Sequence, residues 1–263
     1  MTAKKIIRRV LIALAIVVVL ILAAFVFVFF AVKYGWTNTK GVVDATFPIG
    51  PKPAVTPTQN PAWASTEEWQ TLRVALAKDK AVIDRVSAET GISGRLLVTM
   101  IAPEQLRLYF SNRQIFKEIF APLKILGNEV QFSWGVAGLK QETAKQIEAR
   151  DTTGLLAFAA STTDRDEERF LRIANEKNHY YSYLYTALFL KQIMAQWREA
   201  GFPIDDQPGI LATLFNIGFA HSTPNAEPKV GGSAITIDGT TYSFGGIAYQ
   251  FYYSDELINE FPR

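Results

Sequence analysis

The sequence predicts a mostly α-helical domain with a small C-terminal β-hairpin, preceded by one transmembrane helix. Three observations predict this class. Residues 10–32 form an apolar run without charge, Pro or Gly. From Ser65 onward, apolar residues recur at the three- and four-residue spacing of amphipathic helices. Near the C-terminus, Asp238-Gly239 separates two short alternating segments, which is the pattern of a tight hairpin.

The apolar run 10–32 is expected to cross a membrane. A helix of about 23 residues spans roughly 34 Å, which exceeds a hydrocarbon core of about 30 Å. Four basic residues precede the run and only Lys33 follows it closely. The positive-inside rule therefore keeps the N-terminus in the cytoplasm. Tyr34 and Trp36 stand where interfacial aromatic residues belong. We expect a single-pass protein of the cytoplasmic membrane with an extracytoplasmic C-terminal part.

A cleaved signal peptide is the alternative interpretation of this segment. Its apolar core usually has about 7–15 residues and ends at a small-residue cleavage site. The run here is longer and ends in an aromatic stretch, which favours an uncleaved anchor. Five prolines after it favour extended backbone and a spacer. The chain then divides into four parts: a basic cytoplasmic N-terminus (1–9), a transmembrane helix (10–32), a Pro-rich linker (33–62) and a globular domain (63–263).

Composition argues against several classes of function. Residues 1–36 hold five basic and no acidic residues, so the remainder holds 22 basic and 25 acidic residues, a net charge of −3. A nucleic-acid binder normally has a basic excess, so no nucleic-acid partner is expected. The chain has no Cys, which excludes disulfides and cysteine-based metal or redox sites. It also lacks a phosphate-binding loop, a dinucleotide glycine pattern and a His pair at metal-ligand spacing. No cofactor and no metal are expected.

Local signals divide the globular part into helices. Ser65 or Thr66, followed by Glu68, is typical of an N-cap with an acidic first turn. The helical spacing that follows ends at Gly91, and Ser93 opens a second helix. Further helices are expected over 114–126, 143–150, 153–160, 164–175, 180–200 and 207–219.

Glu104 is the main candidate for chemistry. It lies at the end of an apolar helix, where Leu97, Met100 and Ile101 and the aromatic pair 109–110 would partly desolvate its carboxyl group. Burial disfavours the charged form and raises the pKa of a carboxyl group, as a general acid near neutral pH requires. The alternative is an ordinary Glu at a helix end that faces solvent.

Four segments resemble, in the right order, the motifs of lytic transglycosylases and goose-type lysozymes. The segment "GISGRLLVTMIAPEQL" resembles the helix that leads to the catalytic Glu, which corresponds to Glu104. The segment "SWGVAGLKQETA" is similar to the second motif, with Ser133 and Gly135 at matching positions. The segment "NHYYSYLYTALFLKQI" resembles the family's Tyr-containing helix. The segment "LATLFNIG" is similar to Ala-x-x-Tyr-Asn-Ala-Gly, with Asn216 matching. Together the segments cover about residues 90–218.

This resemblance implies a lysozyme-like fold and an enzyme that cleaves peptidoglycan glycan strands in the bacterial envelope. In the family, one Glu protonates the glycosidic oxygen, and the resulting carboxylate takes the proton of the sugar's own 6-hydroxyl. A 1,6-anhydro product forms without water. Glu104 would act in this way on the MurNAc-GlcNAc bond. Ser133, Asn216 and the backbone near Gly135 would hold the N-acetylated sugar. Aromatic residues would line the cleft, namely Phe215, Tyr180, Tyr181 and Trp134.

Several positions depart from the family pattern. Gln105 replaces the Ser that often follows the Glu, Gly138 replaces the motif Gln, and Gln141 replaces a Pro. Phe215 keeps the ring of the usual Tyr and loses its hydroxyl. These changes remove groups that orient the substrate and leave the acid. A second hypothesis is therefore a non-catalytic domain that binds peptidoglycan within an envelope or secretion assembly. Hydrolysis would need a second carboxylate, for which Glu129 is the candidate.

Overall fold

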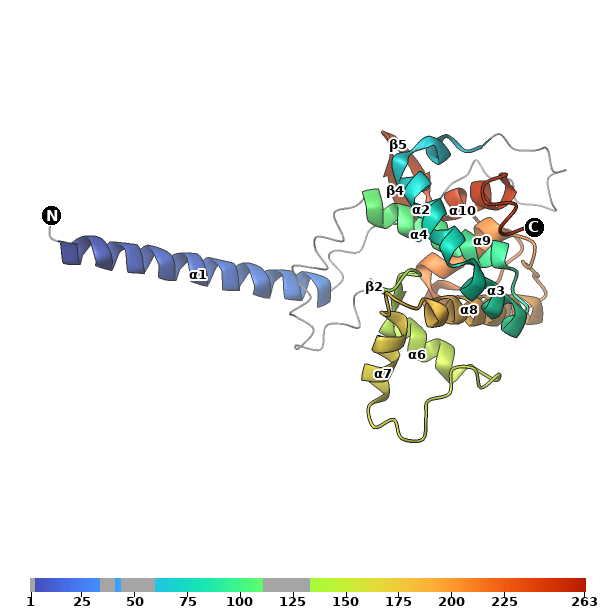
Figure 1. Cartoon of the computed structure of the whole chain (residues 1–263), viewed down its shortest axis with the longest axis horizontal. Helices are drawn as coiled ribbons and strands as arrows, with labels where there is room; N and C mark the ends of the chain where they lie inside the picture. The colour runs from blue at the N-terminus through green and yellow to red at the C-terminus, as the bar shows by residue number, and fades with distance from the viewer. Residues whose placement is uncertain (1–2, 34–40, 44–59, 111–132) are drawn as a thin grey trace.

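The computed structural model describes residues 3–33, 41–43, 60–110 and 133–263 (Figure 1). Its α-helices are α1 (Ala3–Lys33), α2 (Glu67–Lys78), α3 (Lys80–Thr90), α4 (Gly94–Phe110), α6 (Gln141–Ala149), α7 (Arg165–Ile173), α8 (Tyr180–Glu199), α9 (Pro208–Ile217) and α10 (Phe244–Tyr253). Its strands are β1 (Gly41–Val43), β2 (Ser133–Trp134), β3 (Leu139–Lys140), β4 (Gly231–Ile237) and β5 (Thr240–Ser243). Short 3₁₀ helices cover Ala62–Ser65 and Phe219–His221. The predicted class, mostly helical with a small antiparallel C-terminal sheet, is confirmed.

Helix α1 contains the apolar run 10–32 and extends beyond it at both ends. It projects away from the other helices (Figure 1). The described apolar side chains between Val10 and Phe30 are exposed. Within the described ranges, no helix meets the combination of length and apolar character needed to cross a membrane.

Helix α4 lies at the centre of the globular part (Figure 1). It packs against α2, α3, α8, α9 and α10 and against strand β4. Its residues from Leu97 to Ala102 are all fully buried. A helix that is covered on every side must be apolar around its whole circumference, which explains the sequence of this stretch. Glu104 follows the stretch directly and is therefore placed at the edge of the core.

The helical spacing that follows Thr66 belongs to two helices rather than one. The Thr66 hydroxyl caps α2 by accepting a backbone N–H bond at 3.3 Å, as the sequence predicts. Asp79 separates α2 from α3, and its carboxylate contacts His179 at the N-cap of α8 (2.6 Å) and Tyr183 within α8 (2.8 Å). Gly91 ends α3 with φ +76°, as predicted for a left-handed helix cap.

The prediction of a helix over 153–160 is wrong. The carboxylate of Asp151 accepts hydrogen bonds from the Thr153 N–H (2.8 Å), the Thr153 hydroxyl (2.6 Å) and the Leu156 N–H (3.1 Å). Gly154 has φ +75°, outside the helical region. Local side-chain bonds of this kind offer the backbone an alternative to a helix, and the segment forms turns instead. The helix predicted over 114–126 lies outside the described residues.

The predicted C-terminal hairpin is confirmed. Strands β4 and β5 pair antiparallel, with Ile237 opposite Thr240. Asp238 and Gly239 form the two-residue turn with φ +46° and +78°, as the primed turns of such hairpins require. The sequence did not predict α10, which follows directly and is capped by the Ser243 hydroxyl.

Two further strand pairings were not predicted. Strand β1, from the segment expected to be a linker, pairs antiparallel with β4 and extends the sheet to the order β1-β4-β5. Strands β2 and β3 form a small hairpin in which Trp134 lies opposite Leu139. Both additions matter for the site, because β4 and the β2–β3 turn contact the residues described below.

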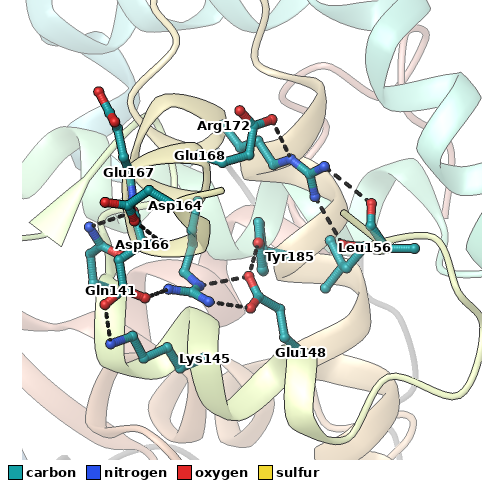
Figure 2. Close-up of polar contacts among 12 residues, drawn as sticks. Gln141, Lys145, Glu148, Leu156, Asp164, Asp166, Glu167, Glu168, Arg172 and Tyr185 are labelled. Atoms are coloured by element: carbon teal, nitrogen blue, oxygen red, sulfur yellow. Dashed lines mark hydrogen bonds and ion pairs between the residues drawn. The ribbon is translucent and has the colours of Figure 1, made fainter. Parts of the chain in front are cut away.

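A buried polar network joins α6, α7 and α8 (Figure 2). The guanidinium of Arg169 donates to both carboxylate oxygens of Glu148, at 2.7 and 2.6 Å, and the Tyr185 hydroxyl donates to the same carboxylate. Burial raises the pKa of Tyr185, so the phenol keeps the proton that it donates. Arg172 donates to the Leu156 carbonyl oxygen at 2.9 Å. The network fixes the position of α6 and, through it, of the β2–β3 hairpin that precedes α6.

Candidate active site

Glu104 is a buried carboxylate on α4, with an exposed fraction of 3%. The apolar residues that the sequence places around it, Leu97, Met100 and Ile101, are fully buried on the same helix. Tyr109 was expected to help cover the carboxyl group, but it is 46% exposed. The burial of Glu104 therefore depends on other parts of the chain.

Arg107 pairs directly with this carboxylate. Its Nη2 donates to Glu104 Oε1 at 2.7 Å and to Oε2 at 2.6 Å, across one turn of α4. The side chains are 13% and 4% exposed. Hydrogen bonds between ionised partners are shorter and stronger than those between neutral groups. The surroundings predicted from the sequence were apolar only, so this cation is an addition that the sequence reasoning missed.

The turn between β2 and β3 lies against the carboxylate. Gly138 in this turn has φ +59°, and a Cβ atom built on it would lie 2.1 Å from Glu104 Oε1. Only a glycine leaves room here. Gln105, the next residue on α4, donates from Nε2 to the Val136 carbonyl oxygen at 2.5 Å and ties the same turn to the helix. Two departures from the family pattern, at Gly138 and Gln105, thus belong to one contact between α4 and the turn.

Asn216 is connected to Glu104 through two side chains. At the end of α9, its Oδ1 accepts hydrogen bonds from the Ser233 N–H (2.8 Å) and the Ser233 hydroxyl (3.1 Å). Arg107 Nη1 donates to the same Ser233 hydroxyl at 3.4 Å. A continuous path therefore runs from Glu104 through Arg107 and Ser233 to Asn216. We call these four residues the Glu104–Asn216 network.

The second motif segment begins with the residues that form the β2–β3 hairpin. Ser133 and Trp134 form β2, and only their backbone is described, with Ser133 opposite Lys140. Gly135 has φ +67°, and a Cβ atom there would lie 2.1 Å from the Ile173 carbonyl oxygen at the end of α7. Gly135 therefore allows close packing of the hairpin on α7, a structural role that is independent of any substrate.

The aromatic candidates make contacts in different places. The ring of Phe215 packs edge-on against an aromatic ring of α8 at 5.4 Å. The Tyr180 hydroxyl donates to Glu89 on α3 at 2.6 Å, and burial raises the pKa of Tyr180 to about 12. The ring of Tyr181 lies under the Arg172 guanidinium of α7 at 4.6 Å. The contacts of the two Tyr residues lead to α3 and α7, and their role in binding substrate stays a prediction.

Arg107 and Ser233 are the site residues that sequence reasoning missed. Residues three apart on a helix are neighbours, so the position of Arg107 after Glu104 was a usable signal. Ser233 lies in β4 and reaches Asn216 only through the fold, and no local pattern marks it.

Other candidates and external comparisons add no further site. Glu129, the candidate for a second carboxylate, lies outside the described residues. In the part of the chain that the structure describes, no group of three or more His, Cys, Asp or Glu residues is arranged to hold a metal ion. Comparisons with protein-family models, with curated proteins and with solved structures found no match to this chain.

Proposed function

We propose that the chain is a membrane-anchored peptidoglycan-cleaving enzyme of lytic transglycosylase type, with a lysozyme-like fold and Glu104 as its single catalytic acid. One observation carries this proposal. Glu104 lies against Gly138 of the second motif segment and is linked through Arg107 and Ser233 to Asn216 of the last motif segment. A substrate site built from these motifs requires that they converge on the acid.

The chemistry follows from one carboxyl group. Protonated Glu104 gives its proton to the glycosidic oxygen as the C1–O bond breaks. The carboxylate then takes the proton of the 6-hydroxyl, whose oxygen bonds to C1 and closes a 1,6-anhydro ring. Asn216 uses its Oδ1 for Ser233, which leaves its amide nitrogen to donate to the carbonyl of an N-acetyl group. No water is consumed, so a second carboxylate is unnecessary.

The proposed location is the cytoplasmic membrane, with the N-terminus inside and the globular domain outside. The anchor is the apolar run 10–32, and its basic N-terminal flank sets the orientation. The exposed apolar side chains of α1 agree with a helix that has lipid as its partner. Peptidoglycan strands outside this membrane would then be within reach of the domain.

A specific observation also favours the second hypothesis. Both carboxylate oxygens of Glu104 accept hydrogen bonds from Arg107, whereas a general acid needs a proton on one of them. If the pair stays intact in the presence of glycan, the domain binds peptidoglycan without cutting it. It would then serve as the glycan-binding part of an envelope or secretion assembly.

Replacing Glu104 by Gln tests the enzyme proposal. The purified protein is incubated with peptidoglycan, and the soluble fragments are analysed by mass spectrometry. We expect the wild type to release anhydro-muropeptides and Glu104→Gln to lose at least about 10²-fold of the rate, because general acid catalysis typically supplies that much. Glu227→Gln, at an exposed site, is the matched control and should retain the wild-type rate.

The other outcomes point to different chemistry. Products with reducing ends would show that water is the nucleophile, and a base such as Glu129 would then be required. Wild-type protein that binds peptidoglycan and releases nothing would support the non-catalytic alternative.

A further inference from the structure

Arg107 is an unusual partner for a proposed general acid. Its Nη2 is shared between the two oxygens of Glu104, and its Nη1 has a long contact of 3.4 Å to Ser233. The side chain is mostly buried, so water gives it little compensation. Both oxygens of the carboxyl group are in contact with this guanidinium, so a glycosidic oxygen has to compete with Arg107 for the acid. For cleavage to occur, the guanidinium has to move to another acceptor.

The guanidinium also has unused hydrogen-bonding capacity. A guanidinium carries five N–H donors, and a buried donor without an acceptor is costly. Among the described residues, the buried Nε of Arg107 has no hydrogen-bond partner. By contrast, Arg169 uses its Nε and Nη2 on both oxygens of Glu148 in a parallel fork. The pairing of Arg107 is therefore incomplete, and an oxygen-rich ligand could improve it.

We propose that Arg107 is a specificity residue that moves from Glu104 to a carboxylate of the substrate, so that the acid is released only when an anionic glycan is bound. This inference rests on the proposed function and deepens it. A planar guanidinium matches a carboxylate with two parallel hydrogen bonds, which its present contact with Glu104 does not provide. The acid and the ligand then compete for one cation.

The substrate chemistry follows from this exchange. In peptide-free strands of peptidoglycan, N-acetylmuramic acid carries a lactyl ether whose free carboxylate lies beside the sugar ring. Where a stem peptide is attached, this carboxyl group forms an amide, and the carboxylates of the peptide are the anionic groups. Chitin has the same β-1,4 linkage and the same N-acetyl groups but no carboxylate. We therefore expect preference for glycans with free lactyl carboxylates over neutral glycans. Only the charged form gives Arg107 an acceptor strong enough to replace Glu104.

The test compares one glycan in two forms. Peptide-free peptidoglycan strands are prepared with their lactyl carboxylates either free or converted to methyl esters. Binding to the full chain in detergent is measured by calorimetry, and cleavage is measured by mass spectrometry. We expect the wild type to favour the free acid at least about tenfold, as a charge-assisted contact would give. Equal binding and equal cleavage of both forms by the wild type would overturn the proposal.

Variants assign the preference to Arg107. Arg107→Gln should reduce the preference for the free acid to near one, and Arg107→Lys should keep an intermediate preference because it retains the charge and loses the planar fork. Arg198→Gln breaks the exposed Arg198–Asp205 ion pair at the end of α8 and is the matched control, with the wild-type preference expected. An Arg107→Gln protein that keeps the full preference contradicts the proposal.

The two proposals fail in distinguishable ways. If the wild type cleaves both forms equally, the enzyme assignment stands and the role of Arg107 falls. If the free acid binds preferentially in an Arg107-dependent manner and nothing is cleaved, the role of Arg107 stands and the enzyme assignment falls. Should Arg107→Gln not fold, as unfolding curves would show, the ester comparison in the wild type and in Arg107→Lys decides the question. Binding of neither form overturns both proposals.

Discussion

At the scale of single residues, the charge of Glu104 is balanced inside the protein by Arg107 rather than by solvent. Apolar surroundings alone would suggest that Glu104→Gln costs little stability, because a desolvated carboxylate is unfavourable. The ion pair changes this expectation. Removing one partner of a buried pair leaves the other uncompensated and typically costs about 3–5 kcal/mol. The Gln amide oxygen can still accept from Arg107, so the loss for Glu104→Gln should lie below that range. Activity losses in this variant therefore need to be compared with its unfolding curve.

A second residue-scale pair gives a pH-dependent stability. His179 Nδ1 lies 2.6 Å from Asp79 Oδ2, and this hydrogen bond raises the pKa of His179 above its ordinary value of 6.5. A pKa that is higher in the folded protein means that the stabilisation is fully present below pH 6.5. It is lost as the pH rises through the raised value. We expect the free energy of unfolding to fall over this range in the wild type and to change less in His179→Gln.

Thermal or urea unfolding at several pH values measures this difference. His221→Gln, at an exposed histidine, is the control and should follow the wild-type curve. The same pH dependence in His179→Gln and in the wild type would contradict the assignment to this pair.

The sequence could identify Glu104 because an acidic residue stands out after a long apolar stretch. It could also have suggested Arg107, which lies one helical turn further on. It could not identify Ser233, because the contact between β4 and α9 depends on how distant segments pack. The position of Gly138 against the carboxylate was equally hidden. From the sequence, this glycine only marks the loss of a motif Gln.

At the scale of elements, strand β1 connects the segment after α1 to the candidate site. Gly41 lies opposite Ser233 and Val42 opposite Gly232. Ser233 belongs to the Glu104–Asn216 network, and a Cβ atom on Gly232 would lie 2.9 Å from Asn216 Oδ1. Strand β1 therefore pairs with the part of β4 that contains Ser233 of the Glu104–Asn216 network. Any loss of β1 should loosen this part of the sheet.

Replacing both Val42 and Val43 by Pro tests the pairing. Adjacent residues of a strand direct their N–H groups to opposite sides, so two prolines at adjacent positions remove at least one donor that faces β4. We expect faster hydrogen exchange of the backbone amides in 231–233, with the exchange of α8 unchanged. Replacement of both residues by Thr keeps the donors and is the control. Unchanged exchange of β4 in the proline variant would show that β1 contributes nothing to its protection.

Elements with a local chemical signal were predictable, and elements that depend on long-range pairing were not. Thr66 and Gly91 mark helix ends, and Asp238-Gly239 marks a hairpin, because cap and turn chemistry acts within a few residues. Strand β1 pairs with a segment about 190 residues away, and three residues carry no strand pattern of their own. The helix predicted over 153–160 failed for a local reason, because hydrogen bonds to the Asp151 side chain outweighed a helical spacing of apolar residues.

At the scale of the whole molecule, the site and the proposed anchor are close along the chain. Helix α1 ends at Lys33 and β1 begins at Gly41. A chain can extend by at most about 3.6 Å per residue, so the eight steps between them span at most roughly 29 Å. Within the segment 33–62, which was expected to be a linker, residues 41–43 pair with β4 as part of the sheet. If α1 lies in the membrane, the β4 strand is held within a few nanometres of the surface.

The last prediction concerns the orientation of the chain in the membrane. A reporter that is active only outside the cytoplasm, fused after Arg263, should be active, because the basic residues lie on the N-terminal side of the apolar run. Its counterpart, a reporter active only inside, should be inactive at the same position. Replacing Lys4, Lys5, Arg8 and Arg9 by Gln and placing four Lys after residue 33 reverses the charge difference and should shift activity to the inside reporter. An active inside reporter on the unaltered chain would contradict the proposed orientation and, with it, access of Glu104 to extracytoplasmic glycan.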